Sequence, residues 1–375
     1  MIYQRTIQAV IEKAFFQNKI IILYGARQVG KTTLVKNIMA KYSDARYIDC
    51  DLLENRQALQ VENKAQLESF LGNYKVVVID EAQRVQNIGL NLKIIHNYLP
   101  KVQIIATGSS SFDLANQINE PLTGRAFDYF LLPLSLEELQ TRYDVLELSA
   151  KLENFLRFGL YPEIVDQPME TAQRLLDTIS SNYLYKDILE FESLKRPQQL
   201  LNILQLLALQ VGNEVSYHEI AKQVGLSSAT VQKYIDLLEK TFVIFKLRAF
   251  SRNLRKEISK SVKVYFWDLG IRNSLIKNYN QLQLRSDVGA LWENFCLVER
   301  LKFNHNHQRS VNCYFWRTYE QQEIDYIEES GGQLRAFEFK WTRQKMKPKK
   351  QFLAAYSNAS FKVINKENFI DILQE

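Results

Sequence analysis

The sequence predicts an α/β protein: a parallel sheet with helices on both faces, followed by a helical lid, a winged-helix module and an α+β domain. Up to about residue 143, short apolar runs alternate with segments of helical periodicity, as in sheets whose parallel strands are joined by helices. Beyond residue 150 the chain becomes leucine-rich and helical, and strand-like runs return from about residue 258. We therefore expect four parts, at residues 1–148, 149–212, 213–257 and 258–375.

The elements of the first part follow from the hydrophobic pattern. Continuous apolar runs rich in β-branched residues are typical of buried parallel strands, and apolar residues at every third or fourth position are typical of helices. The expected strands cover residues 20–24, 46–49, 75–79, 102–106 and 126–132. The expected helices lie near residues 31–41, 65–72, 88–98 and 135–142.

Composition excludes several classes of protein. Of the 375 residues 46% are hydrophobic and 24% are charged, and no apolar run approaches the ~20 residues that a membrane span needs. The N-terminus lacks a basic segment leading into an apolar stretch, so we expect no secretory signal, no membrane partner and a cytoplasmic location. Cys50, Cys296 and Cys313 are odd in number and lack CxxC spacing, which argues against a disulfide framework and a structural zinc site.

The loop after the first strand carries a phosphate-binding pattern. Residues 25–32 read G-A-R-Q-V-G-K-T, which fits G-x-x-x-x-G-K-[ST] at every required position. In this pattern the backbone folds around an anion, Lys31 reaches the β and γ phosphates, and the Thr32 hydroxyl ligates Mg²⁺. The helix that follows adds the positive end of its dipole. The sheet is therefore expected to be that of a P-loop NTPase, with ATP held by Gly25, Ala26, Arg27, Gln28, Val29, Gly30, Lys31, Thr32 and Thr33.

A second strand supplies acidic residues to the same edge of the sheet. The apolar run 76–79 ends in Asp80 and Glu81, and ligands of such sheets bind at the carboxyl ends of the strands. Asp80 is expected to hold Mg²⁺, and Glu81 to orient and deprotonate the attacking water. Without the phosphate loop, an Asp-Glu pair after a strand would indicate only a solvated turn.

Two further positions have competing interpretations. Thr107 or Ser109, after the next strand, could hydrogen-bond the water or the γ-phosphate, or could simply form a turn. Arg125 could neutralise transition-state charge as an arginine finger, although any exposed arginine looks the same in sequence. The sequence does not decide whether Arg125 would act in its own subunit or a neighbour's, nor whether the chain forms a homo-oligomer.

Residues 213–250 predict two helices joined by a turn and followed by a strand. Ser216 caps the first helix and residues 228–240 form the second, the arrangement of a winged helix. Residues 241–263 carry seven basic residues against one acidic residue, so double-stranded DNA is the expected partner. Gln232 and Lys233 are the obvious base-reaching side chains, which favours sequence-tolerant phosphate contact. The alternative is a module that only packs against the first domain or mediates oligomerisation.

The last part contains a second group of charged residues. A helix carrying Glu293 precedes strands expected at 311–317, 323–327 and 334–341. Alternation along the third strand places Glu338 and Lys340 on one face, where Asp325 from the adjacent strand would complete a carboxylate pair for Mg²⁺. Lys340 would then polarise a water for attack on a phosphodiester. The alternative is an exposed polar face, or a nuclease fold that binds without cutting.

Together these motifs resemble those of a known family. The chain is similar to prokaryotic AAA-type ATPases that carry an uncharacterised C-terminal domain, in the phosphate loop, Asp80-Glu81-Ala82-Gln83, Thr107-Gly108-Ser109-Ser110, Gly124-Arg125 and Pro133-Leu134-Ser135. The resemblance covers nearly the whole chain, including residues 158–163 and 183–187, although Leu160 stands where many relatives have glycine. It implies a PD-(D/E)xK nuclease-like domain at the end of the chain, in which Glu293 matches the helix carboxylate.

The sequence thus predicts a Mg²⁺-dependent ATPase, directed to DNA, that couples ATP turnover to movement of the winged-helix and nuclease-like region. A second hypothesis is a nucleotide-gated interaction protein or regulatory switch with an inactive C-terminal domain. A third is a nuclease that needs ATP only as an activating ligand. The expected catalytic residues are Lys31, Glu81 and Arg125 in the first domain and Glu293, Asp325, Glu338 and Lys340 in the last.

Overall fold

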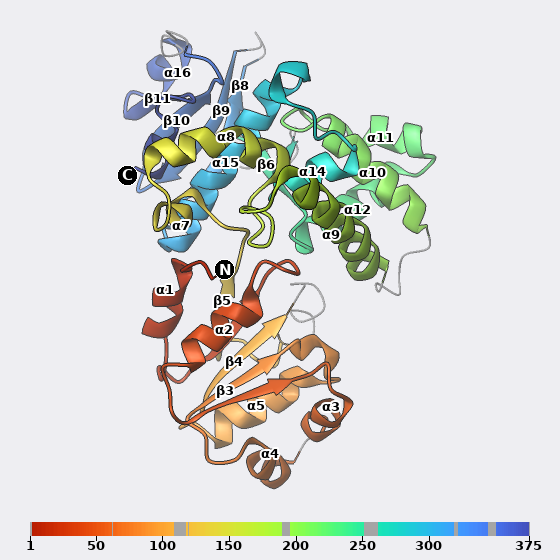
Figure 1. Ribbon diagram of the computed structural model, residues 1–375, viewed down its shortest axis with the longest axis vertical. Coiled ribbons are helices and arrows are strands. Elements are labelled where there is room, and N and C mark those ends of the chain that lie inside the picture. The colour runs from red at the N-terminus through yellow and green to blue at the C-terminus, as the bar shows by residue number, and fades with distance from the viewer. Residues whose placement is uncertain are drawn as a thin grey trace. The chain divides into compact units, whose positions relative to one another are not determined.

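The chain forms two compact units in the computed structural model (Figure 1). Unit 1 is Met1–Pro133 with Lys240–Phe242, and unit 2 is Leu134–Glu239 with Val243–Glu375. The structure describes residues 2–61, 63–108, 118, 120–189, 196–250, 262–318, 322–343 and 350–374. Each unit has its own β-sheet.

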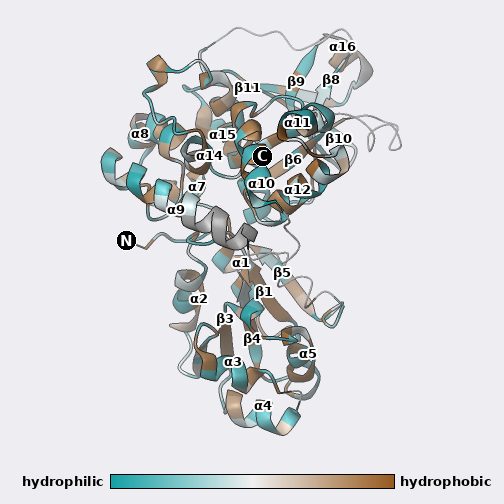
Figure 2. Ribbon diagram, turned by 90° about the vertical axis from the view of Figure 1, so that its right-hand side faces the viewer, coloured by the Kyte–Doolittle hydropathy of each residue, from teal (hydrophilic) through white to brown (hydrophobic). Residues whose placement is uncertain are grey.

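Unit 1 is built on a five-stranded sheet in which every pair of neighbours is parallel. The sheet order is β2-β3-β4-β1-β5. β3 and β4, largely brown in Figure 2, are buried along their whole length, which explains their continuous apolar sequence. The predicted α/β class with a parallel sheet is confirmed. The strands are β1 (Ile20–Tyr24), β2 (Ala45–Asp49), β3 (Val76–Asp80), β4 (Gln103–Gly108) and β5 (Ala126–Phe130).

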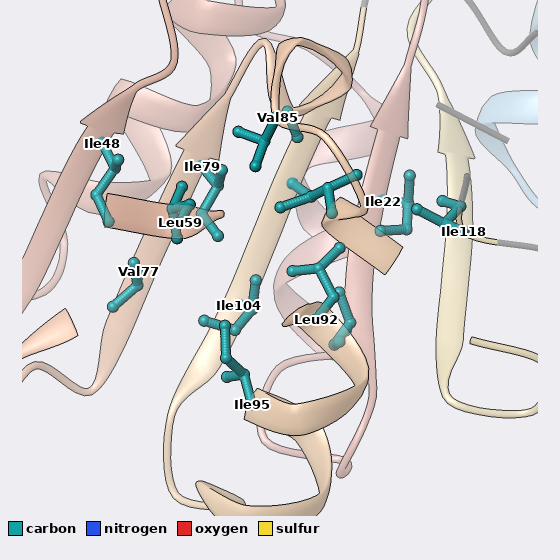
Figure 3. Packing of buried hydrophobic residues seen from close by; sticks show 14 of the residues in the cluster. Ile22, Ile48, Leu59, Val77, Ile79, Val85, Leu92, Ile95, Ile104 and Ile118 are labelled. Carbon is teal, nitrogen blue, oxygen red and sulfur yellow. The ribbon is translucent and has the colours of Figure 1, made fainter. Parts of the chain in front are cut away.

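Helices cover both faces of this sheet. α1 (Ile7–Lys13) packs against α2 (Lys31–Met39), and α2 contacts β3 and β4. On the other face, side chains such as Ile22, Val77 and Ile104 meet leucines and isoleucines of the remaining helices (Figure 3). Burial of this apolar surface is the main stabilising term for the unit. These helices are α3 (Leu53–Leu59), α4 (Lys64–Leu71) and α5 (Ile88–Tyr98), with the 3₁₀ turn η1 at Ala82–Arg84.

Unit 2 begins with helices and contains a six-stranded mixed sheet in the order β11-β10-β9-β8-β6-β7. The helices are α7 (Leu136–Gln140), α8 (Val145–Phe158), α9 (Met169–Leu189), α10 (Pro197–Leu209), α11 (Tyr217–Val224), α12 (Ser228–Lys240), α14 (Leu269–Leu275), α15 (Val288–Asn306) and α16 (Lys350–Ala355), with 3₁₀ turns η2 (Leu282–Leu284) and η3 (Phe369–Leu373). The strands are β6 (Ile244–Ala249), β7 (Val262–Phe266), β8 (Asn312–Arg317), β9 (Glu323–Ser330), β10 (Gln333–Phe339) and β11 (Ala359–Ile364).

The division into units differs from the four parts expected from sequence. The first unit ends at Pro133 rather than near residue 148, because the segment after it is bound within unit 2. There the backbone N–H of Leu136 donates to Glu299 at 2.5 Å, and Lys302 Nζ donates to the carbonyl of Leu134 at 2.7 Å.

The boundary expected between residues 257 and 258 falls in 251–261, outside the described residues. β6 pairs with β7 in antiparallel and with β8 in parallel orientation. The hairpin is therefore continuous with the sheet of the last domain. From α15 onward the order is helix, three antiparallel strands, helix and a parallel strand.

One further observation concerns membranes. Within the described ranges, no helix combines the length and the apolar character needed to cross a bilayer.

Candidate functional site

The loop between β1 and α2 has a backbone that requires glycine at two positions. A Cβ on Gly25 would lie 2.3 Å from the carbonyl oxygen of Leu131, so no larger residue fits there without a backbone shift. Gly30 has φ +98° at the N-cap of α2, a conformation that L side chains rarely adopt. The loop thus leads into a helix N-terminus, where the first backbone N–H groups have no partner within the helix and suit an anion.

Lys31 is buried within the turn of this loop. Its Nζ donates to the carbonyl oxygens of Gly25, at 2.8 Å, and Ala26, at 2.9 Å. Only 5% of the residue is exposed. A charged phosphate oxygen would be a stronger acceptor for this ammonium group than the neutral carbonyls are.

Thr32 and Asp80 meet across the carboxyl edge of the sheet. The Thr32 hydroxyl donates to Asp80 Oδ2 at 2.7 Å. Asp80 also accepts hydrogen bonds from the hydroxyls of Tyr47 on β2 and Thr107 on β4. The contact with Thr107 follows from the strand order, because β4 lies between β1 and β3. The structure therefore brings together the two residues that the sequence predicts as magnesium ligands.

Glu81 follows Asp80 in a left-handed conformation, with φ +53°. The extended backbone of β3 therefore ends before Glu81. Its N–H donates to Thr107 Oγ1 at 3.2 Å, and Gln83 Nε2 donates to its Oε2 at 2.5 Å. Thr107, considered from sequence as a sensor of the γ-phosphate, thus bonds both acidic residues; Ser109 lies outside the described residues.

The donor set fits Mg²⁺ bound together with a nucleotide. A hydroxyl and a carboxylate are hard oxygen ligands, and Mg²⁺ commonly takes one or two protein ligands and completes its octahedron with phosphate and water. Over the residues that the structure describes, no group of three or more His, Cys, Asp or Glu is placed to hold a metal. A site of this composition therefore depends on the triphosphate for its remaining ligands.

Two residues that support this edge were not found from sequence. Arg5 donates to the carbonyls of Val29 in the loop, at 2.7 Å, and Leu132 after β5, at 2.6 Å. Tyr47 bonds Asp80, and burial together with that carboxylate raises the pKa of its phenol. Nothing local in the sequence marks either residue, because their partners lie far away along the chain.

Arg125 lies at the opposite edge of the same sheet. It directly precedes β5, and its carbonyl accepts a hydrogen bond from Ile20 at the start of β1. The phosphate loop follows the other end of β1. Within its own subunit Arg125 is therefore separated from the loop by the length of a strand, and an arginine finger at this position would have to serve a neighbour's nucleotide.

Unit 2 contains a second cluster of charged residues, which we call the carboxylate cluster: Glu293, Glu323, Asp325 and Glu338 with Lys263, Lys340 and Tyr265. Lys263 Nζ lies 3.2 Å from Glu293 Oε1 and is also hydrogen-bonded to Glu323. The Tyr265 hydroxyl donates to Glu293 Oε1 at 2.6 Å. Lys263 was counted among the DNA-binding basic residues, but it is 2% exposed and faces these carboxylates.

Three of the predicted nuclease residues, Asp325, Glu338 and Lys340, contact one another in this cluster. Lys340 Nζ is 3.0 Å from Glu338 Oε1 and 3.7 Å from Asp325 Oδ2. Asp325 Oδ2 also accepts a hydrogen bond from the backbone N–H of Phe339 at 2.7 Å. Burial, together with the charge of Asp325, raises the pKa of Glu293 to about 7, and burial raises that of Asp325. The four predicted residues do share one cluster, but lysines already bond its carboxylates.

The helix pair α11–α12 has the predicted local structure. The Ser216 hydroxyl accepts from the N–H of Glu219 at 3.3 Å, and Gly225 ends α11 at φ +68°. On α12, Gln232 and Lys233 are exposed, while Ile235 and Leu238 are buried. Gln232 and Lys233 therefore lie on the solvent-exposed side of α12, and Ile235 and Leu238 on its packed side.

The basic stretch 241–263 is less available than its sequence suggests. Lys246 Nζ pairs with Asp236 and, at 2.8 Å, with Glu239. Lys263 belongs to the carboxylate cluster, and Arg248 is exposed. The other four basic residues fall in 251–261, outside the described residues. Two of the seven charges are thus neutralised within unit 2.

Comparison with known families supports the assignment of unit 1. Residues 17–140 match a family model described as an AAA domain. A Walker-type ATPase of Pyrococcus abyssi aligns with a TM-score of 0.51 and 17% sequence identity, over 73% of this chain and 96% of that one. Unit 1 has an AAA-type ATPase-like fold. The remaining residues match two models described as domains of unknown function, DUF8612 at 149–282 and DUF4143 at 288–371.

Relatives share both units of the chain. An uncharacterized protein of Mycobacterium tuberculosis is 25% identical over 345 residues, which cover 91% of this chain and 75% of the relative. An uncharacterized protein of Methanocaldococcus jannaschii is 26% identical over 353 residues, covering 83% of this chain and 78% of the relative. The similarity to these relatives therefore extends beyond the AAA domain match at residues 17–140.

Proposed function

We propose that the protein is a Mg²⁺-dependent ATPase. The observation that carries this proposal is the hydrogen bond between Thr32 and Asp80, which joins the end of the phosphate loop to the acidic strand end. The AAA domain match over residues 17–140 supports it independently.

In this proposal different residues of the chain bind the phosphates, hold the cation and accept the proton. The loop backbone and Lys31 bind and orient the phosphates, and Thr32 and Asp80 hold the cation. Bound Mg²⁺ would neutralise charge on the phosphate oxygens. Glu81 accepts a proton from the attacking water, and Gln83 fixes the carboxylate by its hydrogen bond at 2.5 Å.

Phosphate release tests this function directly. With Mg²⁺ and ATP, Glu81→Gln should lower turnover about a hundredfold or more while ATP binding persists, because general-base catalysis contributes roughly that much. Lys31→Ala should lower binding and turnover together. The matched control is Glu68→Gln, an exposed glutamate on α4. Full turnover in Glu81→Gln would contradict the assignment of the base.

We further propose that the ATPase is directed to double-stranded DNA through α12. The exposed side chains Gln232 and Lys233 on α12 support this, since a helix can present such residues to a groove, and Arg248 on β6 is exposed and could contact phosphates. Turnover should rise severalfold on addition of duplex DNA. Lys233→Ala should reduce this rise and Lys222→Ala, an exposed lysine on α11, should leave it unchanged. Turnover that is indifferent to DNA would argue strongly against this part.

A second candidate function is a nucleotide-gated switch with a C-terminal domain that does not cut. The direct bonds of Lys263 and Lys340 to the carboxylates favour it over a nuclease. Plasmid DNA incubated with the protein, Mg²⁺ and ATP should then remain intact. Cleavage that disappears in Asp325→Ala and Glu338→Ala would instead restore the nuclease hypothesis.

The position of Arg125 leads to a conditional proposal about assembly. If subunits associate, Arg125 of one would act on the nucleotide of the next. Mixing Arg125→Ala with Glu81→Gln would then restore part of the turnover, because some interfaces would combine an intact base with an intact arginine. A mixture that stays inactive, while both variants still associate, would remove Arg125 from the catalytic set.

A further inference from the structure

Lys263 occupies an unusual position for a lysine. Only 2% of it is exposed, although its chain segment is rich in basic residues. Its Nζ bonds carboxylates from two other elements, Glu293 on α15 at 3.2 Å and Glu323 on β9, and lies 5.4 Å from the ring centre of Phe315. A lysine buried to this extent is stable only when it is paired. Its ammonium group is therefore a fixed component of the carboxylate cluster.

The remaining carboxylates are also bonded. Lys340 Nζ lies between Glu338 and Asp325, at 3.0 and 3.7 Å. Asp325 Oδ2 also accepts a hydrogen bond from the backbone N–H of Phe339. Each lysine is shared by two carboxylates, so a divalent cation could reach the carboxylate oxygens only by displacing an ammonium group. These residues do not fit the metal that a nuclease-like core would require.

We infer that the ammonium group of Lys263 takes the place of a metal ion in the carboxylate cluster, so that the cluster is closed to divalent cations. Two acidic side chains then bond each lysine, Glu293 and Glu323 at Lys263 and Asp325 and Glu338 at Lys340, and none bonds Mg²⁺. A divalent ion entering the cluster would meet two ammonium charges at close range. This inference concerns unit 2 and does not rest on the ATPase activity.

The inference predicts that removing one lysine opens a metal site. Lys263→Met keeps an unbranched apolar chain of similar length and removes only the charged end. Glu293 and Glu323 would then lack their shared cation, and hard oxygen ligands of this kind bind Mn²⁺. Lys246→Met is the matched control. Lys246 lies on the neighbouring strand β6 and also pairs with two carboxylates.

Binding of Mn²⁺ to the full chain, followed by electron paramagnetic resonance, tests this. Every protein carries Asp80→Asn and is free of nucleotide, which removes the Asp80 carboxylate from the nucleotide site. The parent, which carries Asp80→Asn alone, should bind no Mn²⁺ at millimolar concentration. The same holds for its derivative with Lys246→Met. Lys263→Met should bind one equivalent, and adding Asp325→Asn should abolish that binding.

Each result bears on the inference. Mn²⁺ bound by the parent and lost with Asp325→Asn would overturn it, because the cluster would then accept a metal with Lys263 in place. A folded Lys263→Met protein that binds no Mn²⁺ would overturn the statement that Lys263 stands where a cation would. If Lys263→Met does not fold, Lys263→Gln replaces it, and the titration of the parent still decides whether the cluster is closed.

Discussion

The nucleotide site of unit 1 and the carboxylate cluster of unit 2 use the same residue types in opposite ways. In unit 1, Lys31 donates to two backbone carbonyls and Asp80 accepts from three hydroxyls. In unit 2, Lys263 and Lys340 donate directly to the acidic side chains. In the first arrangement these hydrogen bonds join charged groups to uncharged ones, whereas in the second they join lysines to carboxylates.

This difference determines what each site can bind. A lysine bonded to neutral carbonyls and an aspartate bonded to hydroxyls both lose little when a charged ligand replaces those partners. A buried ion pair must be broken before a metal or phosphate enters, and leaving either charge unpaired costs several kcal/mol. The pattern Asp…Glu-x-Lys therefore does not by itself indicate a metal site.

The largest expected contrast is between two buried aspartates. Asp80→Asn should lower ATP turnover about a hundredfold or more, because a cation that stabilises transition-state charge contributes several kcal/mol. Asp325→Asn should leave turnover within about twofold, since Asp325 belongs to a cluster that we expect to hold no cation. Phosphate release per folded protein measures both. A large loss in Asp325→Asn would show that unit 2 takes part in hydrolysis.

The second contrast compares two paired lysines by their effect on stability. Lys263→Met should lower the free energy of unfolding by about 3 kcal/mol, because it leaves buried acidic groups without a cation. Lys246→Met should cost about 1 kcal/mol or less, since its partners Asp236 and Glu239 are 41% and 36% exposed. Urea unfolding at neutral pH measures both values. Equal losses would mean that Lys263 is no more than an ordinary surface partner.

The sequence predicted the sheet and the nucleotide loop because their causes are local. Continuous apolar runs specify β3 and β4, and the loop pattern specifies its own glycines. Short α1 and α3 were not predicted, because seven-residue helices show too little periodicity and depend on packing. The merging of the β6–β7 hairpin with β8 was not predicted either, because pairing between distant strands leaves no trace in either segment alone.

Among the site residues too, the sequence predicted those that belong to local motifs and missed those that depend on tertiary contacts. Thr32 and Asp80 could be paired from motifs, but Arg5 and Tyr47 act through contacts that only the tertiary structure creates. Lys263 is the clearest case, because its local sequence is basic and suggested an exposed charge. In the structure Lys263 is buried and paired with an acidic side chain. No periodicity in residues 241–263 indicated that this lysine would be buried.

The stability of the folded chain should depend on pH through Glu293. Burial and Asp325 raise the pKa of Glu293 from 4.5 to about 7 in the folded state. Between these pH values the folded chain keeps a proton that the unfolded chain has lost, so this group's contribution to stability falls as pH rises. Urea unfolding at about pH 5 and about pH 8 should show a loss that is smaller in Glu293→Gln. The same loss in both proteins would assign the effect to other groups.

The smallest expected effect tests the hydroxyls that hold Asp80. Tyr47→Phe removes one of three hydrogen bonds to this carboxylate and leaves those from Thr32 and Thr107. A hydrogen bond of this kind contributes about 1 kcal/mol net, so turnover should fall about fivefold. Tyr98→Phe, an exposed tyrosine of the same unit, is the control. An unchanged rate in Tyr47→Phe would mean that two hydroxyls orient Asp80 as well as three, and that Tyr47 serves packing beneath Lys36, whose Nζ lies 4.8 Å from its ring centre.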